Sequence, residues 1–499
     1  MSKQSISKTR GAGILLPVSS LPSNYGIGTF GKEAYDFVDL LAKAKQKYWQ
    51  VLPIGPTSYG DSPYQSFSAF SGNPYMIDLD MLIEEGLLKK EDVTQLVWFE
   101  KEDRVDYGAI FQNRFPVLRM AFENSKHIET EEYKEFCEEN TYWLDDYSLY
   151  MALKTQFNHQ AWFSWDEDIR NREEKAVKRY EKELKEDIDF WKFCQFKFSQ
   201  QWKKLKAYAN EKGIRIIGDV PLYMAMDSVE VWVHGRIFQL DERKNPTHVA
   251  GVPPDGFSPT GQRWGNPLYD WDVMEKDDFS WWRERMKLNA KLYDIIRIDH
   301  FIGIVRYFKI PASCPTAEEG EWIEGPGKKL TDAIQEAVGD SEIIAEDLGI
   351  VVDSVRALNN ETGWPGMKIM EFAFDSGPSN DNLPHHYCKN SIVYGGTHDN
   401  ETLVGYFDNQ NPWHTPFTLD YLGIKDKKDI PNAVIRTAYA SVSNTAIFQM
   451  QDILGLGNEA RMNFPGTFGS NWQWRMKKGQ FEEKHIELLR KYVDVYGRY

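Results

Sequence analysis

The stretch IIRIDHF, residues 295 to 301, decides the fold. Its short run of β-branched residues predicts a buried strand that ends at two polar residues, Asp299 and His300. Because side chains alternate between the two faces of a strand, Arg297 and Asp299 point the same way. A buried strand that carries an arginine and a carboxylate on one face indicates a chemical site at that end.

The same pattern of an amphipathic helix followed by a short apolar strand recurs along the chain. Helix faces precede strands at residues 34–41, 198–205, 281–292 and 330–338. The strands that this pattern predicts are 13–18, 48–52, 214–219, 295–299, 342–347, 367–375 and 391–399. Strands that alternate with helices indicate a parallel sheet in an α/β fold.

Acidic residues stand at the ends of four predicted strands, and these are Asp219, Asp299, Glu346 and Asp399. In a (β/α)8 TIM barrel all those ends lie on the C-terminal face, which carries the active site. A doubly wound open sheet would also gather its strand ends at one edge. We favour the barrel because at least seven strands are countable and no glycine-rich phosphate fingerprint follows the first one.

Two long connections do not fit the barrel repeat. Residues 54–195 lie between the second and third predicted strands, and residues 222–280 lie between the third and fourth. We therefore predict one catalytic barrel over residues 1–499 with both segments inserted on its active face. The first insertion is expected to hold a charged helix over residues 166–188.

Composition excludes several classes of function. The formal charge of −16 argues against nucleic acid and anionic membrane surfaces, whose binding rests on Lys and Arg. No stretch approaches the roughly 18 apolar residues of a membrane helix, and the basic start lacks the apolar core of a secretory signal. The four scattered cysteines show no CxxC spacing, which predicts reduced thiols in the cytoplasm.

Aromatic residues make up 14% of the chain, with 17 Trp and 25 Tyr. Most are expected in the core. A surplus could line a cleft for a neutral, hydroxyl-rich ligand, because amphipathic rings stack on apolar faces and offer polar tips.

The acids themselves fit glycosidic bond cleavage, which commonly uses one carboxylate nucleophile and one carboxylic acid. We expect Asp299 to stay ionised because the Arg297 cation beside it favours the charged form. Apolar neighbours of Glu346 disfavour its charged form, which suits a general acid. His398 and Asp399 can both hydrogen-bond sugar hydroxyls.

Two other chemistries remain as alternatives. His300, His398 and several Asp could ligate a cation, although the sequence holds no HExxH or HxH pair. A Ser/His/Asp hydrolase is weaker still, because no GxSxG elbow is present.

At these residues the chain resembles the amylomaltase, or 4-α-glucanotransferase, family of the α-amylase superfamily (glycoside hydrolase family 77). The resemblance runs almost end to end and is specific. The motifs that carry it are GILLPVSSLPSNYGIG (13–28), SYGDSPYQSFSAFSGNPY (58–75), IGDVPLY (217–223), GVPPDGFSPTGQRWGNPLYDW (251–271), IRIDHF (296–301), AEDLG (345–349), GTHDNET (396–402) and ARMNFPGTFGSNW (460–472).

The resemblance implies a role for each motif residue. Asp299 would be the nucleophile, Glu346 the acid/base and Asp399 the acid that stabilises the transition state. The residues expected to bind substrate are Arg297, Asp219, His398, Tyr64, Ser62 and Asn463, together with Phe257 and Trp264 in a covering loop at 249–265 and Tyr59 at a secondary glucan site. No metal and no cofactor are expected, and the family lacks a C-terminal β-sandwich.

The expected reaction transfers a segment of an α-1,4-glucan to the 4-hydroxyl of an acceptor glucose or glucan. It would retain the α linkage through two inversions. An amylase-like hydrolase with water as acceptor would use the same barrel and acids. A non-catalytic glucan-binding protein is a further alternative, which the intact acids disfavour. The sequence gives no prediction of oligomeric state.

Overall fold

Eight parallel strands form the centre of the protein in a computed structural model that describes residues 5–255, 258–467 and 469–499. The strands pair in the order β10-β11-β12-β1-β2-β3-β6-β9. The Ala345 amide, at the end of β9, donates to the Pro365 carbonyl next to β10 at 3.0 Å, so the sheet curls into a nearly closed barrel. The strands are β1 (Gly11–Leu15), β2 (Tyr48–Gln50), β3 (Arg215–Val220), β6 (Ile295–Ile298), β9 (Glu342–Ala345), β10 (Gly366–Ile369), β11 (Ser391–Tyr394) and β12 (Thr445–Gln449).

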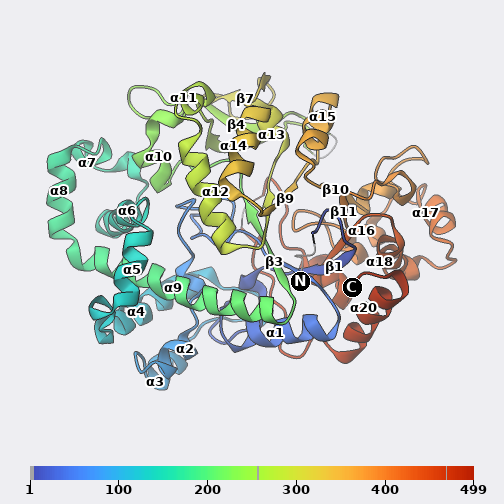
Figure 1. The fold of residues 1–499 in the computed structure, drawn as a ribbon, viewed down its shortest axis with the longest axis horizontal. Helices are drawn as coiled ribbons and strands as arrows, with labels where there is room; N and C mark the ends of the chain where they lie inside the picture. Colours follow the sequence, from blue (N-terminus) through green and yellow to red (C-terminus); the bar gives the residue numbers. More distant parts are fainter. Residues whose placement is uncertain (1–4, 256–257, 468) are drawn as a thin grey trace.

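These short strands are buried along almost their whole length, as strands covered on both faces must be. Helices surround the barrel (Figure 1). On α1, Phe37 and Leu41 are buried in the core. The strand β12 was not among the seven that the sequence predicted. The helices outside the barrel are α1 (Lys32–Lys43), α9 (Lys185–Glu211), α12 (Ser280–Leu292), α14 (Lys328–Val338), α15 (Asp353–Thr362), α16 (Leu403–Asn409), α17 (Thr415–Leu422), α18 (Ile430–Ala440), α19 (Met450–Leu454) and α20 (Glu483–Tyr496).

The connection from β2 to β3 holds a largely helical region that extends to the left of the barrel in Figure 1. The single charged helix predicted over residues 166–188 is wrong. Arg172 adopts a φ of 58°, which ends α7, and Leu184 separates α8 from α9. The helices of this region before α9 are α2 (Leu79–Glu84), α3 (Lys90–Thr94), α4 (Tyr107–Asn124), α5 (Glu131–Glu139), α6 (Leu144–Gln156), α7 (Glu167–Arg170) and α8 (Glu174–Glu183).

A second, antiparallel sheet with the order β5-β4-β7-β8 was not predicted from the sequence. Strands β4 (His248–Val252) and β5 (Gln262–Pro267) come from the connection between β3 and β6, which also holds α10 (Val229–Val233) and α11 (Trp271–Lys276). Strands β7 (Arg306–Pro311) and β8 (Glu321–Glu324) follow β6 and the short helix α13 (Ile302–Val305). The sheet therefore joins two connections that leave neighbouring barrel strands.

The end of the chain returns to the start of the barrel (Figure 1). Arg498 is fully buried, and its Nη1 donates to the carbonyls of Gly11 at 3.1 Å and Asn444 at 3.0 Å. Its Nε donates to the Tyr439 carbonyl at 2.8 Å. One guanidinium thus ties α18 to β1 and β12. Within the described residues no strand follows β12, which agrees with the expected lack of a β-sandwich.

We predict that Arg498→Ala lowers the free energy of unfolding by about 3 kcal/mol, because several buried carbonyls lose their donor. Urea denaturation of the purified protein measures the change. Lys491→Ala, at an exposed position on the helix α20 that precedes Arg498, is the control and should change stability little. Equal stabilities of the two variants would contradict the assigned role of Arg498.

Candidate active site

Arg297 lies at the centre of the acid cluster, at the C-terminal end of β6. Asp219 on β3 is its direct partner in the parallel register, and Asp299 is two residues further along the same face. The Arg297 Nη1 lies 2.7 Å from both carboxylate oxygens of Asp219 and 3.0 Å from Oδ1 of Asp299. The strand pairing itself therefore brings the three charged groups together.

Burial shapes the charges of this cluster. Arg297 and Asp219 are almost completely buried, whereas the Asp299 side chain keeps 26% of its surface exposed. Burial raises the pKa of Asp219, and the Arg297 guanidinium opposes that rise. Burial alone would lower the pKa of Arg297, but Asp219 and Asp299 raise it well above its ordinary value, so Arg297 stays charged. Asp299 is the acid of this trio that a ligand can reach.

Glu346 directly follows β9 and is 9% exposed. Its Oε2 accepts a hydrogen bond from the His300 amide at 2.6 Å, and its Oε1 accepts one from the Leu348 amide at 3.3 Å. Burial raises the pKa of Glu346 well above its ordinary value, and the charge of Asp299 adds to the rise while Arg297 opposes it. A carboxyl held neutral in this way can donate a proton.

His300 connects the two acids through its backbone. Its φ of 52° is left-handed, a conformation that residues other than glycine rarely adopt. This turn directs the His300 amide to Glu346 immediately after Asp299 in the chain. The buried imidazole has a pKa lowered to about 4 by burial, and its Nε2 has no hydrogen-bond partner among the described residues.

Asp399 lies in the loop after β11 rather than at the strand end, because β11 stops at Tyr394. The Asn463 Nδ2 donates to its Oδ1 at 2.6 Å, and the His398 Nε2 lies 3.4 Å from its Oδ2. Desolvation alone would raise the pKa of Asp399, but His398 and Asn463 lower it to about 2. These two neighbours therefore favour the ionised form of Asp399.

Tyr64 closes the cluster from the connection after β2. Its hydroxyl donates to Oδ2 of Asp219 at 2.9 Å, and its ring stacks on His398 with centroids 5.0 Å apart. Burial raises the pKa of the Tyr64 hydroxyl, which stays protonated. Ser62 supports the same turn, because its Oγ accepts from the Tyr64 amide at 3.3 Å.

The remaining sequence candidates differ in their position. The Trp264 ring meets the His300 ring edge to face, with centroids 4.9 Å apart, so the second sheet reaches the acids. Tyr59 is 97% exposed and makes no ring contact among the described residues. Phe257 lies outside the described residues.

Sequence reasoning missed two residues that support the site. It weighed His300 only as a metal ligand, because no pattern in the sequence signals a left-handed φ. Arg461 was also missed, although it stands in the same motif as Asn463. Its Nη2 donates to the Asp399 carbonyl at 2.8 Å, and its Nε donates to the Asn463 carbonyl at 2.8 Å.

In the part of the chain that the structure describes, no three His, Cys, Asp or Glu side chains are grouped as ligands for an ion. The described part also contains no helix that is long and apolar enough to cross a membrane.

Similarity to known proteins extends over almost the whole chain. A family description, 4-alpha-glucanotransferase of glycoside hydrolase family 77, matches residues 16–481. The chain belongs to this family. It is 49% identical over 483 residues to the 4-alpha-glucanotransferase of Clostridium butyricum, covering 96% of this chain and 99% of that protein. It is 46% identical to the enzyme of Thermus thermophilus, covering 98% of this chain and 99% of that one.

A solved relative confirms the barrel. The structure of the amylomaltase from Streptococcus agalactiae in complex with acarbose matches with a TM-score of 0.95 at 44% identity. The match covers 98% of this chain and 99% of that one. The 4-α-glucanotransferase family and the (β/α)8 fold class that the sequence predicted are thus both confirmed.

The left-handed turn at His300 should affect the pH dependence of catalysis. The hydrogen bond that the residue 300 amide donates to Glu346 favours the charged form of that carboxyl, so loss of this hydrogen bond should raise the pKa of Glu346 further. His300→Val disfavours the turn because valine is β-branched, whereas His300→Asn and His300→Gly tolerate it. We expect the alkaline limb of kcat/KM to move up by about one pH unit in the valine variant only.

The measurement is kcat/KM against pH for all three variants. The asparagine and glycine variants are the controls, since they remove the imidazole and keep the backbone turn. An alkaline limb that moved equally in all three would assign the effect to the imidazole and contradict the backbone role.

Proposed function

We propose that this protein is a 4-α-glucanotransferase that moves a segment of an α-1,4-glucan to the 4-hydroxyl of an acceptor glucan or glucose. The observation that carries the proposal is the pair of unequal acids on one barrel face. Asp299 is partly exposed beside Arg297, and Glu346 is buried with a raised pKa. The family membership and the named relatives support the same reaction.

In the first half-reaction, the Asp299 carboxylate attacks the anomeric carbon while Glu346 protonates the leaving oxygen. A covalent glucosyl-enzyme forms, with inversion at that carbon. In the second half-reaction, Glu346 takes the proton of the acceptor hydroxyl, which attacks the same carbon with a second inversion. The α linkage is retained.

The other residues of the site would bind the sugar ring at the cleavage point and orient the acids. Asp399 stays ionised and could bind ring hydroxyls and stabilise the positive charge that develops on the ring. His398 and Asn463 orient Asp399, and Arg297 with Asp219 orients the nucleophile. Tyr64 offers an aromatic ring beside them, supported by Ser62.

We also propose that residues 54–195 and 222–280 act as subdomains inserted in the barrel, with the loop at 249–265 covering the substrate. Trp264 supports this role because it reaches His300 from β5. Such a cover would exclude water and favour a sugar acceptor. Phe257 in the same loop and the exposed Tyr59 are further proposed sugar contacts.

A reducing compartment, the cytoplasm, is proposed as the location. All four cysteines are free thiols, which is typical of proteins that fold where glutathione keeps thiols reduced. The substrate would then be an intracellular maltodextrin or glycogen-like glucan.

Substitution of each acid tests its role. Asp299→Asn should lower kcat by about a thousandfold or more, because the amide is no nucleophile. Glu346→Gln should fail with maltodextrins but still release a burst of fluoride from α-glucosyl fluoride, stoichiometric with the protein, since fluoride leaves without a proton while the second step lacks its base. Steady-state rates with maltodextrins and rapid-mixing measurement of fluoride release measure the two effects. Near-normal turnover by Asp299→Asn, or the absence of a fluoride burst from Glu346→Gln, would refute the assignments.

Incubation with maltotriose alone separates transfer from hydrolysis. We expect glucose and a ladder of longer maltodextrins, with constant total reducing ends, because each broken bond is remade. Trp264→Ala should raise the hydrolytic share by admitting water, and Asp299→Asn serves as the blank. Glucose and maltose with steadily rising reducing ends would identify a hydrolase instead.

A further inference from the structure

Trp472, the last residue of the motif ARMNFPGTFGSNW, adopts a φ of 65°. A left-handed backbone at so bulky a residue is strained, and such strain persists only where the surrounding structure holds it in place. Residues that are held in this way cluster at active sites. The side chain is only 6% exposed, so it offers little surface to a ligand and packs instead against other side chains.

The Trp472 ring packs against two side chains of the active site. Its centroid lies 5.9 Å from that of the His398 ring and 5.8 Å from that of the Tyr64 ring. Those two rings stack on each other with centroids 5.0 Å apart and 15° between their planes. The three rings therefore form one packed group, to which the connections after β2, β11 and β12 contribute one ring each.

His398 depends on this group of rings for its orientation. A histidine whose one ring nitrogen acts on a partner is commonly oriented by a hydrogen bond at the other nitrogen. The Nε2 of His398 lies 3.4 Å from Oδ2 of Asp399, but its buried Nδ1 has no hydrogen-bond partner among the described residues. Packing against the Tyr64 and Trp472 rings takes the place of that hydrogen bond.

The backbone of Trp472 is held on both sides. Its amide donates to the Met462 carbonyl at 2.7 Å, and its carbonyl accepts from the Tyr107 hydroxyl at 2.9 Å. Asn463, the residue after Met462, donates its amide to the His398 carbonyl at 3.1 Å. Two consecutive residues therefore join the backbone of Trp472 to that of His398.

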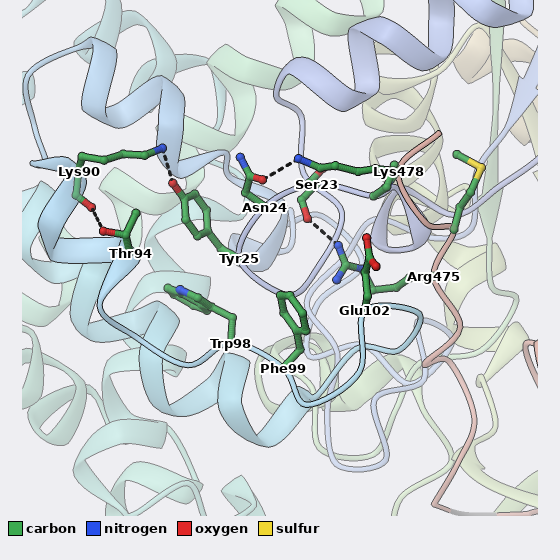
Figure 2. A pocket seen from close by; sticks show the side chains of 12 residues that line it. Ser23, Asn24, Tyr25, Lys90, Thr94, Trp98, Phe99, Glu102, Arg475 and Lys478 are labelled. Carbon is green, nitrogen blue, oxygen red and sulfur yellow. Dashed lines mark hydrogen bonds between the residues drawn. The ribbon is translucent and has the colours of Figure 1, made fainter. Parts of the chain in front are cut away.

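The region inserted after β2 holds the segment that carries this turn. The Val105 amide donates to the Gln473 carbonyl at 2.7 Å, and the Arg475 amide donates to the Asp103 carbonyl at 2.9 Å. The guanidinium of Arg475 is buried at the edge of the pocket in Figure 2, where its Nη2 donates to the Ser23 carbonyl at 2.6 Å. The strained turn is thus anchored to the connections that follow β1 and β2.

We propose that Trp472 is a positioning residue, whose ring keeps the imidazole of His398 directed at Asp399. Through Tyr64, the same ring supports the hydroxyl that donates to Asp219. The inference rests on the proposed function, which assigns Asp399 to the sugar at the cleavage point. Without the ring, the imidazole can turn away, and a carboxylate that is no longer fixed stabilises the developing charge less well. The loss falls mainly on the transition state, so kcat should fall while KM changes little.

A double-mutant cycle on kcat tests whether Trp472 acts through His398. Trp472→Leu removes the flat ring, and we expect kcat for glucose release from maltotriose to fall about tenfold. In a His398→Ala background the same substitution should lower kcat less than about threefold, because the imidazole that the ring positions is absent. Trp472→Phe restores an aromatic ring and should recover most of the lost kcat. Neither leucine nor phenylalanine relieves the left-handed backbone, so the two variants differ in the ring alone.

Trp474→Leu is the matched control. Trp474 belongs to the same segment and is 5% exposed, and among the described residues it makes no ring contact with His398 or Tyr64. Its substitution should lower the free energy of unfolding about as much as Trp472→Leu does, and it should leave kcat unchanged. Tyr107→Phe removes only the hydrogen bond to the Trp472 carbonyl and should lower kcat about threefold where His398 is present. It carries the same cycle if Trp472→Leu does not fold.

An equal loss of kcat with and without His398 would overturn the proposal, because the ring would then act independently of the imidazole. So would an unchanged kcat in Trp472→Leu, or an equal loss of kcat in Trp474→Leu. Glucose is released from maltotriose by a transferase and by a hydrolase, so the cycle can be read in either case. The ladder of longer maltodextrins reports on the proposed function separately.

Discussion

The ion pair between Arg297 and Asp219 is the interaction on which the site depends. Both groups are buried, so each needs the other to remain charged inside the barrel. Their strands are paired in register, and the same guanidinium nitrogen holds Asp299 at 3.0 Å. A pairing of β3 and β6 shifted by one residue would place Arg297 and Asp219 on opposite faces and break the ion pair that positions Asp299.

From this centre, the environment separates the acids into three roles. Asp299 contacts the Arg297 cation and remains accessible, Glu346 is buried with a pKa raised above its ordinary value, and His398 and Asn463 lower the pKa of Asp399 to about 2. One turn of backbone at His300 connects the first two, because His300 follows Asp299 in the chain and donates its amide to Glu346. The proposed retaining chemistry uses such a pair, with one carboxylate as nucleophile and one carboxylic acid as proton donor.

The sequence predicted the elements whose signals are local. The runs around Asp219, Asp299 and Glu346 are apolar strands that end in acids, and the structure places all three as expected. Strand β12 was missed although its apolar run TAIFQ follows the helix α18 in the same local pattern, and Asp399 was assigned to a strand end although a glycine turn precedes it. The antiparallel sheet and the His300 turn depend on contacts between distant segments, which no local pattern encodes.

The central claim is that Asp299 carries the sugar between donor and acceptor. The most direct measurement is to incubate Glu346→Gln with α-glucosyl fluoride in the absence of an acceptor, digest the protein, and map the modified peptide by mass spectrometry. The first half-reaction needs no acid with this donor and the second is slowed without its base, so glucose should accumulate on Asp299. A glucosyl group found on another carboxylate, or no adduct while fluoride is released at an undiminished rate, would contradict the account.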